Sequence, residues 1–275
     1  MGEVQPMVRA VERDARGIIA PDVGLTRFRL DRYPPSAQVA RFVDRYWVAT
    51  WDLTGQDPFT QRVFAHPVVN AVLADGAFTV HGVTTRIGAR TLSGAGRALG
   101  IMFRPAGFRP FAGGSMAKLR DRTLPFADVF GADAVALLAH EVTAAADPVG
   151  MAAAADRFLD SQMPSQVWES EATSALVEKV AADPTFVRVD ALAALCALTP
   201  RQLQRRFADH VGIGPKATIR RYRFYEAAER ARGADVDWAD LAAELGYSDQ
   251  AHLTREFSAI VGLPPSRYAR ACRAG

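Results

Sequence analysis

The amino-acid sequence predicts an α+β protein with a β-rich N-terminal domain and an all-helical C-terminal domain. Three observations support this fold class. Short strand-like runs with turn signals fill residues 23–112, helical spacing takes over after Pro125, and a repeated unit with an offset of 49 to 50 residues occupies residues 185–275. The 275 residues are about twice the ~150 of a typical domain, so we place the two domains at 1–165 and 166–275.

The N-terminal runs are rich in Val, Phe, Thr, Tyr and Trp, the residues that favour β-strands. They are Thr26–Leu30, Phe42–Trp51, Gln61–Phe64, Val68–Leu73, Phe78–Val83 and Ala98–Phe103. Asp75-Gly76 separates two apolar runs, which is typical of a tight hairpin. Many short strands with regular turns indicate a barrel or a sandwich, although Phe42–Trp51 is also compatible with the start of a helix.

Alanine and leucine at helical spacing predict helices over residues 126–146, 149–161 and 167–182. The domain boundary falls between Met163 and Thr185, where Pro164 and Pro184 interrupt the helical pattern. Two interpretations of the helices in 126–161 remain open. They either pair between two protomers or close the end of the β-rich domain within one chain.

Composition and charge restrict the class of protein. Apolar residues make up 49% and charged residues 23% of the chain, as in an ordinary globular protein. No apolar run reaches the ~18 residues of a membrane span, and the polar N-terminus lacks the apolar segment of a secretory signal. With only Cys196 and Cys272 there is no disulfide framework and no four-cysteine zinc site. We therefore expect a cytoplasmic protein that does not associate with membranes.

The net charge of +3 is unevenly distributed. From Pro184 to the end there are 14 Lys and Arg residues against 10 Asp and Glu residues, and nearly all of the basic residues are arginine. Arginine offers a planar set of donors that suits phosphates and guanine edges. A general bias of the chain toward Arg and Ala explains the same excess, so charge alone is weak support for nucleic-acid binding.

The repeat in the last third is the strongest signal. Each copy contains a Leu-Ala pair, then a Leu-x-Arg-x-Phe segment, then Gly and Pro: Leu192, Leu203, Arg205, Phe207, Gly212 and Pro215 match Leu241, Leu253, Arg255, Phe257, Gly262 and Pro265. Such self-similarity indicates two copies of one supersecondary unit. We assign a helix-turn-helix to each copy, at about 185–214 and 235–271. Asp190 and Asp237 are predicted to cap the first helices, Thr199 with Gln202 the second helix of copy one, and Ser248 or Asp249 that of copy two.

The second helix of each copy has one apolar and one polar face. Leu203 and Phe207 in copy one, and Leu253 and Phe257 in copy two, are spaced to point inward. The outward faces carry Arg201, Gln204 and Arg205, and Gln250, Ala251, Thr254 and Arg255. Arginine pairs with guanine, glutamine with adenine, and small apolar groups contact the thymine methyl, so these residues are predicted to read base edges in the major groove.

Residues 215–232 join the two copies as one helix of ~27 Å, close to the ~34 Å of one turn of DNA. Arg220 and Arg221 on this helix, with Thr199 and Ser248 at the starts of the reading helices, are predicted to contact phosphates. For the linker arginines a solvated helix face is a nearly equal alternative.

These motifs give residues 185–271 a clear resemblance to the DNA-binding domain of the AraC/XylS transcription regulators. The match includes Arg223 and Ala227 in the linker and the closing Gly262-x-x-Pro265-x-x-Tyr268 pattern. Three positions depart from the family pattern: Ala197 replaces a Gly, Gly214 a Ser and Thr218 an aromatic residue. The resemblance implies that the seven base-reading residues above contact duplex DNA. It also implies a homodimer and RNA polymerase as a further partner.

Residues 26–130 are similar to an uncharacterised N-terminal module found in some of these regulators. The shared features are Tyr33-Pro34-Pro35, Tyr46-Trp47, Ala65–Asn70, Gly82-Val83-Thr84 and Phe103–Gly107. This second resemblance implies a cupin-like β-barrel with trailing helices. We predict that its interior binds a small-molecule effector, with the following lining: Trp47, Trp51, Phe64, His66, Asn70 and Met102. The alternative is that the large side chains simply fill the core, so that the domain only dimerises.

An enzyme is not indicated. A metal-binding cupin needs a His-x-His pair with a nearby carboxylate and a later His, whereas His66 and His81 stand alone. Gly94-Ala95-Gly96 lacks the third glycine and the strand-helix context of a dinucleotide site. We therefore expect no metal, no cofactor and no catalytic residues, and a cupin-type enzyme fused to a DNA-binding domain is the rival of a different class.

Overall fold

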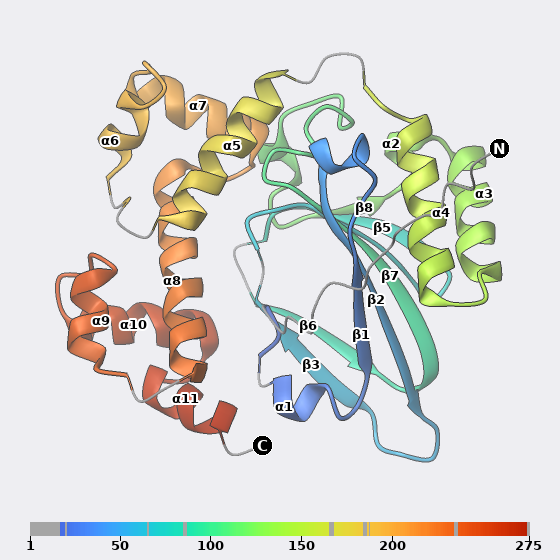
Figure 1. The fold of residues 1–275 in the computed structure, drawn as a ribbon, viewed down its shortest axis with the longest axis horizontal. Coiled ribbons are helices and arrows are strands. Elements are labelled where there is room, and N and C mark those ends of the chain that lie inside the picture. The colour runs from blue at the N-terminus through green and yellow to red at the C-terminus, as the bar shows by residue number, and fades with distance from the viewer. Residues whose placement is uncertain are drawn as a thin grey trace, which may run out of the picture.

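The computed structural model describes residues 17–19, 21–64, 66–84, 87–164, 168–183, 186, 188–233 and 236–273. A β-rich N-terminal part lies beside a helical C-terminal part, which confirms the mixed α and β composition (Figure 1). The boundary that we placed between residues 165 and 166 lies outside the described residues, so the domain limits stay a prediction.

Within the described residues, six strands form one antiparallel sheet in the order β1-β2-β7-β4-β5-β8, and two more form a separate ribbon, β3-β6. The bounds are β1 (Arg29–Tyr33), β2 (Val43–Leu53), β3 (Phe59–Val63), β4 (Asn70–Ala74), β5 (Ala77–His81), β6 (Gly88–Leu92), β7 (Gly94–Phe103) and β8 (Thr123–Pro125). The edge strands β1 and β8 do not pair with each other, so these strands do not close into the expected barrel.

Two local predictions about the strands are resolved. The run Phe42–Trp51 is not helical, because Val43–Leu53 forms β2, the long strand that pairs with both β1 and β7. Asp75 and Gly76 form the tight turn between β4 and β5, and both have positive φ, +50° and +76°. A two-residue turn with positive φ at both positions matches the twist of the strands that it joins.

The β3-β6 ribbon packs across one end of the large sheet. Leu92 of the ribbon is buried with Leu53 and Ala49 of β2, and Trp47, Trp51 and Phe59 pack around them. Figure 1 shows the ribbon beside the lower ends of β1 and β2. This apolar cluster joins the ribbon to the sheet through side chains.

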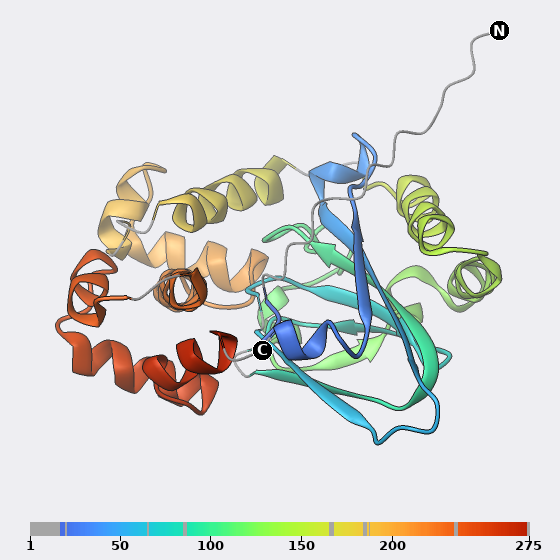
Figure 2. The same ribbon diagram turned by 60° about the horizontal axis from the view of Figure 1, so that its bottom comes forward.

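The helices α3 (Ala132–Ala144) and α4 (Pro148–Ser161) cover the sheet on the side away from the C-terminal part (Figure 2). Val135, Leu138 and Val142 of α3 are buried, as their spacing predicts. Asp156 of α4 accepts a hydrogen bond of 2.9 Å from the Tyr46 hydroxyl of β2. Helix α4 therefore packs against the sheet of its own chain, and α3 packs on α4. The shorter elements are α1 (Pro21–Gly24), η1 (Val39–Arg41), η2 (Met116–Leu119) and α2 (Ala127–Phe130).

Seven helices make up the described C-terminal part. They are α5 (Trp168–Ala182), α6 (Val189–Ala194), α7 (Pro200–His210), α8 (Pro215–Gly233), α9 (Trp238–Glu244), α10 (Gln250–Val261) and α11 (Pro265–Arg273). The capping box of Thr199 and Gln202 is present, and Asp237 and Asp249 cap α9 and α10. The prediction for Asp190 was wrong: α6 begins one residue earlier, so Asp190 lies in its first turn, where a carboxylate favours the helix dipole.

One hydrophobic core extends from the large sheet into the first helical unit. Phe103 of β7 and Leu203 and Phe207 of α7 belong to the same buried cluster. Helix α5 is held to the N-terminal part by ion pairs, Arg41 with Glu171 and Arg104 with Glu178, at 2.6 and 2.5 Å. Among the described helices, none is both long and apolar enough to cross a bilayer.

Candidate nucleic-acid interface

Each copy of the repeat folds as a helix, a tight turn and a second helix, α6-α7 and α9-α10. The apolar pairs of the second helices are buried: Leu203 and Phe207 are 0% exposed, and Leu253 and Phe257 are 1% and 0% exposed. In copy one, the turn contains Ala197 with φ +51°, a conformation that favours the glycine of the AraC/XylS pattern. Copy one therefore keeps the expected turn despite the less suitable residue.

The exposed faces of α7 and α10 agree with the prediction made from the spacing of their leucine and phenylalanine. Arg201, Gln204 and Arg205 on α7 are exposed, as are Gln250, Ala251 and Arg255 on α10, and Thr254 is half-buried. Arg201, Arg205, Ala251 and Arg255 lie on the side of each helix opposite its buried leucine and phenylalanine. Gln250 is exposed because it begins α10, although its spacing from Leu253 places it above the buried face. That the seven residues contact bases stays a prediction.

Helix α8 separates the two units. Its 19 residues span ~28 Å, and Figure 1 shows α7 and α10 near its opposite ends. Copy two is fixed to α8 by polar contacts. Arg220 pairs with Glu256 of α10, and Arg223 donates to the Gly246 carbonyl at 3.0 Å, with its guanidinium 5.4 Å from the centre of the Tyr247 ring.

The four predicted phosphate contacts lie in different environments. Thr199 and Ser248 are exposed at the starts of α7 and α10, and the Thr199 hydroxyl donates to the Gln202 side chain at 2.9 Å. Arg220 is 54% exposed but already paired with Glu256. Arg221 is only 8% exposed and donates to the Thr84 carbonyl at 3.2 Å, so it faces the N-terminal part.

Arg221 cannot reach a phosphate in this arrangement of the two parts. Helical spacing placed it next to Arg220 but gave no sign of the N-terminal surface that covers it. Its burial also lowers the pKa of its guanidinium below the ordinary value of the group, because the charged form loses hydration.

A polar cleft of about 520 Å³ lies beside α7. Its lining comes from the loop before η2, from α5 and from α6-α7: Ser115, Glu169, Leu198, Gln202, Arg205, Arg206, Ala208, Asp209 and His210. This cleft could not be predicted from the amino-acid sequence, because its walls come from three segments far apart in the chain. Arg205, a predicted base-reading residue, is one of its lining residues.

The six residues predicted to line an effector pocket do not meet in one place. Phe64 packs against α8 and α11, with ring centres 5.1 Å from Phe224 and 6.0 Å from Tyr268, and the His66 ring stacks on Tyr225 at 4.4 Å. Trp47 and Trp51 belong to the cluster under the ribbon, and Asn70 and Met102 are cross-strand partners in β4 and β7.

The physical reason is the contact between the two parts of the chain. Strand β3 ends at Val63, and the segment that follows it lies against α8 instead of turning into the sheet. Phe64 and His66 therefore serve the contact between the parts. The alternation of apolar and polar residues along β3 could not have predicted this contact. Alternation indicates which side chains are buried, but it does not indicate which segment covers them.

Among the described residues, no group of three or more His, Cys, Asp or Glu side chains is placed to hold a metal ion. His81 is flanked by two threonine hydroxyls, Thr79 at 3.0 Å and Thr123 at 3.1 Å.

Comparison with known proteins assigns two segments of the chain. Residues 192–271 match the profile of a helix-turn-helix domain, and residues 31–125 match that of a domain of unknown function (DUF6597). A putative AraC-like transcription regulator from Streptomyces lividans is 32% identical over 79 residues, which are 29% of this chain and 26% of that protein. The F1 operon positive regulatory protein from Yersinia pestis is 32% identical over 83 residues, 30% of this chain and 28% of that protein.

The chain thus spans just over a quarter of the length of each of these relatives. Among solved structures, ToxT from Vibrio cholerae O395 is 11% identical with a TM-score of 0.40, covering 91% of this chain and all of that one. The C-terminal domain of AraT, a response regulator from Geobacillus stearothermophilus, is 20% identical with a TM-score of 0.31, covering 34% and 84%.

Proposed function

We propose that this chain is a sequence-specific DNA-binding regulator of transcription, from the helix-turn-helix domain at residues 192–271 and from the similarity of the chain to a putative AraC-like transcription regulator. The observation that carries the proposal is the duplicated reading surface. Two helices, α7 and α10, each bury a leucine and a phenylalanine and expose an arginine-bearing face, and they lie near opposite ends of α8, which is ~28 Å long. A linker of this length is close to the ~34 Å between successive major grooves on one side of a duplex.

In this proposal, Arg201, Gln204 and Arg205 read one segment of the site, and Gln250, Ala251, Thr254 and Arg255 read the other. Thr199, Ser248 and the exposed part of Arg220 contact the flanking phosphates. Arg221 joins them only if the N-terminal part moves away from α8, because its guanidinium donates to the Thr84 carbonyl.

We assign the N-terminal part, residues 1–165, to control of DNA binding rather than to catalysis. A cupin-like arrangement, binding of a small-molecule effector, homodimerisation and contact with RNA polymerase belong to this proposal as well. The packing of Phe64 and His66 on α8 supports it, because an effector or a second protomer that shifted this contact would shift the reading helices. The alternative is an N-terminal part that only dimerises.

The test begins with selection of DNA fragments by the purified full chain from the genome of its source. Binding to the selected fragment is then measured for Arg205→Ala and Arg255→Ala, with Arg157→Ala, an exposed arginine on α4, as the control. Each reading variant should lose ~1–3 kcal/mol of binding free energy on that fragment, and its base preference should relax at the positions it reads. Wild-type affinity of both reading variants would contradict the proposed reading faces.

A further inference from the structure

Three basic side chains lie together on the segment that leads from η2 into β8. Lys118, Arg120 and Arg122 are exposed, whereas Leu119 between them packs against the core. Asp121 accepts a hydrogen bond of 3.2 Å from the Thr84 hydroxyl. Within the described part of the chain, none of the three basic groups has an acidic partner. Lys118 lies in η2, and Arg120 and Arg122 flank Asp121, whose φ is +56°, so the three positive charges lie on a short helix and on the turn that follows it.

The backbone beneath these charges is firmly held. The Gly82 amide donates to the Arg122 carbonyl and the Asp121 amide to the Val83 carbonyl, both at 3.0 Å. Gly82 lies so close to the Leu119 carbonyl that a methyl group at this position would overlap it. The three charges are thus presented by a fixed segment, so binding a ligand would order little besides the side chains themselves.

The same segment is docked on the first reading helix. The Ser115 hydroxyl donates to the Ala208 carbonyl of α7 at 3.3 Å, and Arg109 pairs with Asp209 at 3.1 Å. Met116 is 2% exposed, and a Cβ atom at Gly212, just after α7, would lie 2.9 Å from its carbonyl oxygen. Ser115 also lines the cleft that contains Arg205, so the segment lies next to the reading face of α7.

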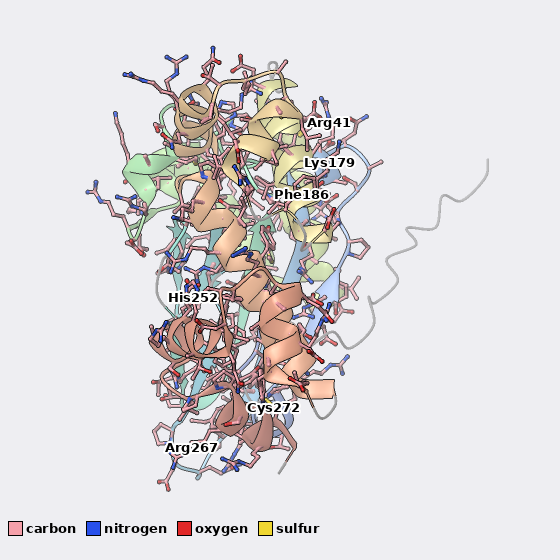
Figure 3. The ribbon with its side chains drawn as sticks, turned by 90° about the vertical axis from the view of Figure 1, so that its left-hand side faces the viewer. Arg41, Lys179, Phe186, His252, Arg267 and Cys272 are labelled. Carbon is pink, nitrogen blue, oxygen red and sulfur yellow. The ribbon has the colours of Figure 1, made fainter. Side chains whose placement is uncertain are left out.

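Figure 3 looks onto the helical part of the molecule. The pale green η2 segment lies at the left edge, with nitrogen-tipped side chains that point away from the molecule, and His252 of α10 lies on the same side lower down. A duplex running along this side would meet both features.

We propose that Lys118, Arg120 and Arg122 form a second DNA-binding surface, which contacts backbone phosphates flanking the base pairs read by α7. The inference rests on the proposed function and extends it, because it assigns part of the DNA contact to the N-terminal part. Lysine and arginine without acidic partners bind phosphates without first breaking an ion pair. Such contacts add affinity through counterion release and carry no base preference.

The experiment uses the full chain and the DNA fragment selected by the wild-type protein. The variant Lys118→Gln/Arg120→Gln/Arg122→Gln is compared with wild type between 0.05 and 0.3 M salt. If all three residues contact phosphates, the slope of log K against log salt should become shallower by about 2–3, and affinity at 0.15 M salt should fall by roughly 10- to 100-fold. The ratio of affinities for selected and unrelated DNA should change little.

The control variant, Arg27→Gln/Arg29→Gln/Arg90→Gln, removes the same charge from exposed positions before and in β1 and in β6. It should keep the wild-type slope. If the triple variant folds poorly, the single variant Arg120→Gln replaces it, and its slope of log K against log salt should be shallower than that of wild type by about 1. A basic-segment variant whose slope equals that of the control would overturn this inference while leaving the proposed function intact. Loss of site preference in wild type itself would overturn the proposed function instead.

Discussion

His210, at the end of α7, is the buried titratable side chain of the first reading unit. Its Nδ1 atom lies 2.9 Å from the Thr173 hydroxyl, and its Nε2 atom lies 3.4 Å from Asp209 and 3.8 Å from Glu169, with Arg109 and Arg206 also facing the ring. Burial lowers the pKa of this imidazole, and the two arginines act in the same direction against the two carboxylates.

The sign of the pH dependence follows from this lowered pKa. Below pH ~6.5 the unfolded chain binds a proton at His210 that the folded chain does not, so stability falls as pH falls through that value. We expect His210→Gln to flatten the decline of the urea midpoint between pH 7.5 and 5.5. His140→Gln, at an exposed site on α3, should decline as wild type does. Equal pH profiles for His210→Gln and wild type would remove His210 as the cause.

At the level of helices and turns, the end of α7 differs from the end of α10 in what surrounds its glycine. Gly212 and Gly262 occupy matching positions of the repeat, with φ +95° and +79°. A Cβ atom at Gly212 would lie 2.9 Å from the Met116 carbonyl oxygen, whereas at Gly262 the nearest atom is Arg62 Nη2 at 3.7 Å. Both helices therefore end on a residue that must tolerate positive φ. The end of α7 lies against the backbone of η2, whereas the end of α10 meets the N-terminal part through the flexible Arg62 side chain, whose Nη2 atom donates to the Val261 carbonyl at 2.8 Å.

Comparing alanine substitutions at these two glycines separates the free energy of the contact between η2 and the end of α7 from the cost of positive φ. Gly262→Ala should lower the free energy of unfolding by ~1–2 kcal/mol, the cost of a left-handed alanine. Gly212→Ala should cost more, because the backbone of η2 or α7 must also move. Urea denaturation of the two variants measures the difference. Equal losses would mean that η2 yields freely and is not fixed on α7.

For the molecule as a whole, the aromatic contact around Phe64 joins the N-terminal part to α8 and α11. Phe64 is 4% exposed and meets Phe224, Tyr225 and Tyr268 edge-on or tilted. Removal of a buried phenylalanine ring typically costs ~3–5 kcal/mol. We expect Phe64→Ala to lose about that much stability and to increase the radius of gyration in solution scattering, because it weakens the contact between the two parts.

Phe78 supplies the matched control. It is 8% exposed and stacks on Phe126 at 4.2 Å, entirely within the N-terminal part. Phe78→Ala should cost a similar free energy of unfolding but leave the radius of gyration unchanged. If Phe64→Ala stays as compact as Phe78→Ala, then other contacts, such as those of Arg109 and Ser115 with α7, suffice to hold the parts together.

Local chemistry made the helical repeat predictable. The spacing of Leu203 with Phe207 and of Leu253 with Phe257 fixes which face of each helix is buried, and the caps at Thr199 and Asp237 fix where helices begin. Exposure of Arg205 and Arg255 follows from the same spacing. The strands and the Asp75-Gly76 hairpin were also predictable from the sequence, because strand and turn preferences depend on residues that are only a few positions apart.

The sequence by itself therefore determined the helix-turn-helix units, their inward and outward faces and most of the strands. Only the tertiary structure decided which surfaces meet. It placed Phe64 and His66 on α8, covered Arg221 with Thr84, left the sheet open and brought Ser115, at the start of the basic segment, onto α7. The reason is physical: periodicity records whether a side chain is buried, whereas its partner depends on packing between segments that lie far apart in the chain.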